Sequence, residues 1–153
     1  MPTSRTRRPI QFAALLVGVA FLVVGVLGFI PGITSGDLHF AGPHSAAELF
    51  GAFQVSVLHN LVHLLFGVLG IAAFAGPWPA RTFLMVGGGL YLVLWIYGLA
   101  LDDESPVNFI PVNNADNWLH LGLGAAMVAL GLSATAAERA KGEYPRDPAG
   151  SDG

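Results

Sequence analysis

The sequence predicts an all-α protein, an integral membrane four-helix bundle built from two tandem transmembrane helical hairpins. Three observations predict this class: the composition, four long apolar runs and a motif that occurs twice. Of the 153 residues, 54% are hydrophobic and only 11% are charged. A typical soluble domain has roughly 45–50% and about 25%.

Four runs without Asp, Glu, Lys or Arg reach the roughly 20 apolar residues that cross about 30 Å of hydrocarbon. They are Pro9–Ile30, Val55–Gly76, Thr82–Leu101 and Asn117–Ala137. Because lipid offers no hydrogen bonds to a peptide backbone, each run is expected to be an α-helix. The expected membrane domain is therefore 9–137, between a basic tail, 1–8, and a charged tail rich in Pro and Gly, 138–153, expected to be disordered.

The first run follows three arginines, as the core of a signal peptide does. It extends over Pro9–Ile30, well beyond the usual roughly 7–15 residues of such a core, and no A-x-A cleavage site follows. We expect it to be a retained membrane helix.

The basic residues predict the orientation. All of them lie in the two tails or between the second and third runs: Arg5, Arg7, Arg8, Arg81, Arg139, Lys141 and Arg146. By the positive-inside rule, both termini are expected in the cytoplasm. Aromatic residues near the ends of the runs are interpreted as interfacial anchors: Trp78 near an inner end, and Tyr91, Trp95, Tyr97 and Trp118 near outer ends.

The first outer loop contains Ser45-Ala-Ala-Glu48, the pattern of a capping box. This predicts a helix that begins at Ser45 and continues directly into the second run. Glu48, Asn60 and His63 would then share one stripe of that helix.

A repeated motif, NxxHLxxG, begins at Asn60 and again at Asn117. Both copies lie at the outer start of an even-numbered run, as in parallel repeats related by an axis along the membrane normal. Asn, His and Gly at i, i+3 and i+7 share one helix face. Gly67 and Gly124 would then allow close packing, while the polar side chains face the bundle interior.

The repeat predicts one polar pocket at the outer ends of the second and fourth helices. His59 and Asp116 precede the two motifs and are equivalent positions. The expected pocket residues are Asn60, Asn117 and Glu48, with His59, His63, His120 and Asp116 as candidate metal ligands.

With these two motifs on four spans, the chain resembles the bacterial membrane protein family catalogued as domain of unknown function 4383. The resemblance covers roughly residues 9–137. It implies a four-span integral membrane protein and no activity, substrate or catalytic residue. We expect this multi-pass protein in a bacterial plasma membrane.

Several uses of the pocket remain open. In the first use, Asn and His serve simply as hydrogen-bonding contacts between helices and bind no ligand. Three imidazoles and a carboxylate suit a divalent transition metal, and His63 with His120 suits a b-type haem, for which Gly67 and Gly124 would leave room. The acidic outer loops would also attract a small solute or cation for transport.

The sequence favours a non-enzymatic structural or interaction role. It contains no GxSxG elbow, P-loop or complete dinucleotide fingerprint, and no cysteine. No basic stripe for nucleic acid is present. The expected partners are the lipid bilayer and either further copies of the chain or another membrane protein.

Overall fold

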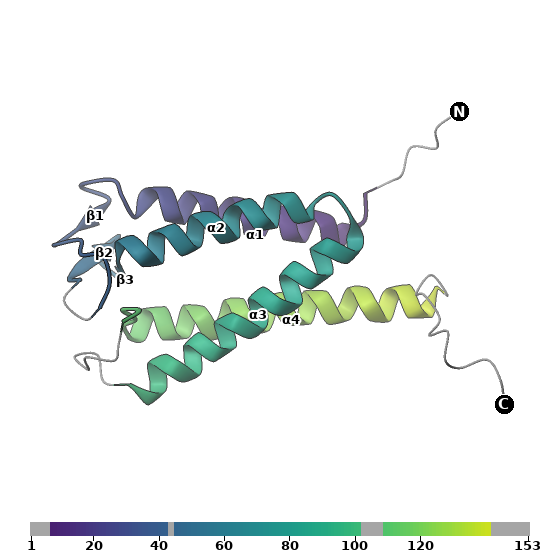
Figure 1. Cartoon of the computed structure of the whole chain (residues 1–153). Coiled ribbons are helices and arrows are strands. Elements are labelled where there is room, and N and C mark those ends of the chain that lie inside the picture. The colour runs from purple at the N-terminus through teal and green to yellow at the C-terminus, as the bar shows by residue number, and fades with distance from the viewer. Residues whose placement is uncertain (1–6, 43–44, 102–108, 142–153) are drawn as a thin grey trace.

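The computed structural model describes residues 7–42, 45–101 and 109–141. Four helices run back and forth between two ends of the molecule (Figure 1): α1 Pro9–Leu27, α2 Val57–Ala73, α3 Pro77–Ala100 and α4 Asn114–Ala140. Both ends of the described chain lie at one end of the molecule with the α2–α3 turn, and a small sheet lies at the other.

Three helices are long and apolar enough to cross a membrane: α1, α3 and the part of α4 over Asn114–Ala137. Helix α2, with 17 residues, is shorter than the predicted run. Large apolar side chains remain exposed along the helices, as for Leu16 at 69% and Val93 at 61%. Such apolar surfaces fit an uncharacterised membrane protein.

Helix boundaries differ from the predicted runs where local signals intervene. Helix α3 begins at Pro77, ahead of the predicted start at Thr82, because Pro is well suited to the first helical turn. Helix α4 continues to Ala140, beyond the expected end at Ala137. The rest of the tail expected to be disordered, 142–153, lies outside the described residues.

The helix predicted from Ser45 is wrong, because this segment forms part of a three-stranded antiparallel sheet. Strands β1 Thr34–Ser35, β2 Ala47–Leu49 and β3 Phe53–Val55 pair in the order β1-β2-β3. The Ser45 hydroxyl donates to the Val55 carbonyl at 2.7 Å instead of capping a helix. Phe50 and Gly51 have φ values of 57° and 64° and form the tight turn between β2 and β3.

The sheet covers the C-terminal end of α1. Ala47 and Leu49 are buried, while Glu48 between them points to the exposed face, as strand alternation requires. The buried face packs against Val24 and Leu27 of α1. The main core lies between the helices and is formed by Ile10, Ala14, Phe21, Ala73, Ala80, Leu84, Tyr91 and Met127.

Candidate functional site

Each asparagine of the repeated motif packs against a glycine of the preceding helix. The Asn60 side-chain amide donates to the Gly28 carbonyl at 2.8 Å. A Cβ at Gly28 would overlap the amide of Asn60, and a Cβ at Gly98 would likewise overlap the amide of Asn117. Asn60 therefore faces the end of α1, and Asn117 faces α3. The expectation that both asparagines line one shared pocket is corrected by these contacts.

The glycines of the motif also lie against the preceding helix. A Cβ built on Gly18 would come within 2.9 Å of the Gly67 carbonyl, and one on Gly88 would meet the Gly124 carbonyl at the same distance. Gly67 also faces Leu22. The α1–α2 and α3–α4 backbones thus touch, and the room that a haem would need beside these glycines is taken.

The odd-numbered helices share a second sequence similarity, which the NxxHLxxG motif alone does not show. Gly18-x-x-Phe21-Leu-Val on α1 corresponds to Gly88-x-x-Tyr91-Leu-Val on α3. Gly28 follows the first segment at the same interval at which Gly98 follows the second. The glycine contacts between α1 and α2 described above therefore have counterparts between α3 and α4.

The histidines meet where the two helix pairs face each other. The rings of His59 and His63 stack with centroids 4.5 Å apart, and those of His59 and His120 are 6.4 Å apart. His63 Nε2 lies 3.1 Å from the Tyr91 hydroxyl. We call His59, His63, His120 and Tyr91 the imidazole cluster.

Tyr91 is a central residue and not the interfacial anchor that its position near a helix end indicated. Its side chain is buried. Its ring stacks on that of Phe21 at 5.5 Å with only 7° between the planes, and lies edge-on to His120 at 5.0 Å. Phe21 and Tyr91 are the aromatic residues of the second similarity, so a repeat search over the odd-numbered helices would have found this pair.

Asp116 caps α4 and ties it to the sheet. Its Oδ2 accepts hydrogen bonds from the backbone N–H groups of Asn113 and Gln54, both at 3.0 Å. The Asn113 side chain accepts in return from the Asp116 N–H at 3.0 Å, which completes a capping box. The Ser56 hydroxyl caps α2 through the His59 N–H at 3.1 Å. The useful capping signals were thus Ser56 and Asn113, not Ser45.

Two cavities lie on either side of the imidazole cluster. The sheet-side cavity, of about 400 Å³, lies between α1 and α4 and is walled by Leu49, Phe53 and Val55 of the sheet. The loop-side cavity, of about 380 Å³, lies between α2 and α3 and is walled by Phe109 and Ile110. All four cluster residues line both cavities.

Many of the helix residues that line the two cavities correspond through the two sequence similarities. On the even-numbered helices, the sheet-side cavity has Asp116, Leu119, His120 and Leu123 where the loop-side cavity has His59, Val62, His63 and Phe66. On the odd-numbered helices, the sheet-side cavity has Ala20, Phe21 and Val24 where the loop-side cavity has Leu90, Tyr91 and Leu94. The two cavities are thus built alike.

The cluster presents polar atoms that the described protein leaves unsatisfied. The Nδ1 atoms of His59, His63 and His120 are buried and have no hydrogen-bond partner within the described part of the chain. Buried polar atoms are almost always paired in proteins. The three histidines that carry these atoms also line the two apolar cavities, which have the size of small-molecule sites.

The predicted ligand set does not form a metal centre as arranged. Within residues 7–42, 45–101 and 109–141, no group of three or more His, Cys, Asp or Glu side chains is arranged to hold a metal ion. Asp116 is engaged by backbone N–H groups, and Glu48 lies on the exposed face of the sheet.

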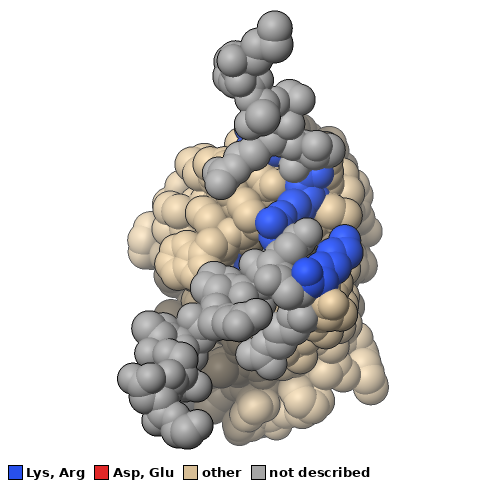
Figure 2. Space-filling model, turned by 90° about the vertical axis from the view of Figure 1, so that its right-hand side faces the viewer, with Lys and Arg blue, Asp and Glu red and all other residues tan. Residues whose placement is uncertain are grey.

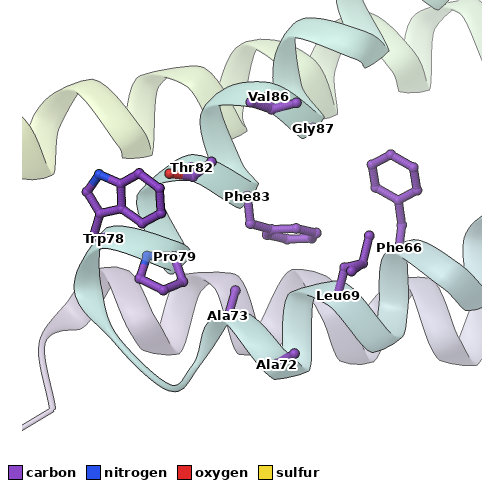
Figure 3. A pocket seen from close by; sticks show the side chains of 10 residues that line it. All are labelled: Phe66, Leu69, Ala72, Ala73, Trp78, Pro79, Thr82, Phe83, Val86 and Gly87. Atoms are coloured by element: carbon purple, nitrogen blue, oxygen red, sulfur yellow. The ribbon is translucent and has the colours of Figure 1, made fainter.

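A further hollow of about 430 Å³ lies between α2 and α3, close to their connecting turn (Figure 3). Trp78 and Pro79 stand at one end and Phe66 at the other. The Thr82 hydroxyl and the Trp78 indole are the polar side-chain groups of its lining. It includes no residue of the imidazole cluster, and its lining lacks convergent polar groups.

Comparison with known proteins identifies a family whose description assigns no function. Residues 11–133 match the family model described as Domain of unknown function (DUF4383). No curated protein and no solved structure matches the chain.

Proposed function

Since the chain belongs to the DUF4383 family, whose description assigns no activity, we propose a function from the geometry of the imidazole cluster. The chain is a four-helix integral membrane protein that binds a small membrane-soluble molecule, without catalysing a reaction. The molecule has a hydrogen-bonding carbonyl or hydroxyl head and an apolar body. The three unpartnered imidazole Nδ1 atoms between two apolar cavities carry this proposal.

The chemistry of the lining selects this class of ligand. A neutral imidazole offers one donor and one acceptor, so a carbonyl or a hydroxyl can bond to it. The rest of the lining is largely apolar, as Leu16, Leu119 and Leu123 show for the sheet-side cavity. Cavities of about 400 Å³ lie within the usual size range of small-molecule sites.

Placement in the membrane follows from the helices. We propose that α2 also crosses the bilayer, because it packs along α1 and the next helix returns from its far end. The two pairs, α1–α2 and α3–α4, then form tandem hairpins of one orientation in a bacterial plasma membrane, with both termini cytoplasmic. The constant register within each of the two sequence similarities supports this repeat.

A purely structural or interaction role is the second candidate, and the asparagine contacts favour it. The bond from Asn60 to Gly28 needs no ligand to explain it. A metal site has less support, since Asp116 and His63 already have protein partners. A haem has less support, since the glycines leave no room for its ring. No contact described above favours transport.

Binding of farnesol, a hydroxyl-bearing terpene, tests the proposal. The full-length protein in mild detergent is titrated with labelled farnesol, and farnesane, the hydrocarbon without the hydroxyl, serves as the headless control. His63→Leu and His120→Leu should each weaken farnesol binding by about fivefold to tenfold, the value of one hydrogen bond. His39→Leu, a substitution in the exposed loop, should leave the affinity unchanged.

The two candidates give different results. Equal binding of farnesol and farnesane, or unchanged farnesol affinity in both cluster variants, would contradict the ligand site and leave the structural role. Helical circular dichroism of each variant establishes that it has folded before binding is compared.

A further inference from the structure

A second candidate site lies at the opposite end of the molecule from the sheet. A cavity of about 620 Å³ lies between the beginning of α1 and the end of α4. We call it the basic cavity, because Arg7, Arg8 and Lys141 line it. Figure 2 views this end and shows Lys and Arg side chains gathered there, with no Asp or Glu among the described side chains on this face.

The end of α2 holds the side chain of Arg7 in place. Arg7 Nη1 donates to the carbonyls of Phe74 and Ala75 at 2.7 and 3.3 Å. Its guanidinium also lies 4.6 Å from the centre of the Phe74 ring. Both bonds use one nitrogen of a group that has five N–H donors, so the guanidinium retains donors for a second acceptor.

The adjoining backbone is fixed as well. The side chain of Gln11 accepts from the Arg8 N–H at 2.9 Å and donates to the Phe74 carbonyl at 2.7 Å. The first turn of α1 is thereby bonded to the C-terminal end of α2. These bonds hold the backbone that carries the two arginines.

The rest of the lining, which we call the floor of the basic cavity, is apolar apart from Ser133 and includes three alanines. Ile10 and Ala13 come from α1, and Ala134 and Ala137 come from α4. The small alanines leave space between the two helices within the same cavity that the three cations line. None of the described residues that line this cavity is acidic.

We infer that the basic cavity binds an anionic phospholipid from the leaflet on the side of the termini. The headgroup phosphate lies among Arg7, Arg8 and Lys141, and the first part of an acyl chain lies on the apolar floor. Basic pockets between membrane helices recognise anionic headgroups in this manner, and each cation near the membrane surface strengthens binding by about fivefold. The inference uses the membrane placement proposed above, but not the imidazole cluster.

Native mass spectrometry of the full-length protein in detergent tests this site. Phosphatidylglycerol is the probe, and phosphatidylcholine, which carries no net charge, is the control lipid. Lys141→Gln should weaken retention of phosphatidylglycerol by about fivefold, whereas Arg81→Gln, at the same end but outside this cavity, should not.

A second pair of variants separates the cavity from general surface charge. Ala134→Leu fills the floor and should reduce retention of phosphatidylglycerol, while Ala136→Leu adds the same volume to an exposed position of α4 and should not. Added glycerol phosphate should not displace the lipid, because it lacks the acyl chain.

Three results would overturn the inference: equal retention of the two lipids, equal loss with Lys141→Gln and Arg81→Gln, or full displacement by glycerol phosphate. The last would identify the site as one for a soluble phosphate. Farnesol binding reports on the imidazole cluster alone, so a failure of the lipid site is distinguishable from a failure of the proposed function.

Discussion

Asn60 is the buried polar side chain whose contribution to stability is easiest to isolate. It is fully buried, and its amide satisfies the Gly28 carbonyl at the end of α1. Asn60→Ala leaves this carbonyl without that partner, which should reduce the free energy of unfolding by about 1–2 kcal/mol. Unfolding in mixed detergent micelles, followed by circular dichroism, measures the change.

Asn114→Ala is the matched control, since Asn114 is exposed at the start of α4. It should change the free energy of unfolding by no more than a few tenths of a kcal/mol. If the two variants unfold alike, the Asn60–Gly28 bond does not hold α2 to α1.

At the scale of single residues, the sequence identified the polar positions better than their partners. Asn60, His63, Asn117 and His120 are indeed at the helix interfaces, because lipid excludes such groups. The interpretation of Tyr91 as an interfacial anchor is wrong, since an aromatic ring near a helix end has the same sequence signature whether it faces lipid, water or a neighbouring helix.

Helix packing depends on glycines whose surroundings differ sharply within one helix. A Cβ at Gly124 would meet the Gly88 carbonyl at 2.9 Å, but one at Gly122 would meet nothing within 4 Å. Gly124→Ala should therefore destabilise the protein by about 1–3 kcal/mol through forced separation of α3 and α4. Gly122→Ala should be neutral or stabilise by up to about 1 kcal/mol.

The same micelle unfolding assay compares the two variants. A Gly124→Ala protein as stable as Gly122→Ala would show that α3 and α4 do not require backbone contact. Gly88→Ala against Gly89→Ala repeats the test on the partner helix, where only Gly88 of this pair has close neighbours.

At the scale of elements, hydropathy located the helices and missed the sheet. Apolar runs are long enough to average over local irregularity, whereas strands as short as β1, β2 and β3 give almost no periodic signal. The Ser45–Glu48 pattern predicts a helix start from local signals alone, whereas a tertiary bond to the Val55 carbonyl engages the Ser45 hydroxyl.

The arrangement of the whole molecule predicts which segments share one side of the membrane, and the positive-inside rule predicts which of the two sides is cytoplasmic. The α2–α3 turn lies at the end where the described chain begins and ends, and the sheet lies at the other (Figure 1). Because the chain contains no cysteine, a single introduced cysteine reports its own position. Ala52→Cys, in the β2–β3 turn, should react with an impermeant maleimide in intact cells.

Ala75→Cys, in the α2–α3 turn, should react only after the cells are permeabilised. Both alanines are exposed, so the comparison depends on the side of the membrane and not on burial. Labelling of both positions in intact cells would show that the two ends are not separated by the bilayer.

The two cavities differ mainly in what the interhelical connections add to them. Seven positions of their helical walls correspond, but the sheet closes one side with Leu49, Phe53 and Val55, while Phe109 and Ile110 close the other. Substitutions in a connection thus reshape one cavity and leave its counterpart intact. The corresponding helix positions give both cavities a common framework, so differences in what the two cavities admit are expected to come from the connections.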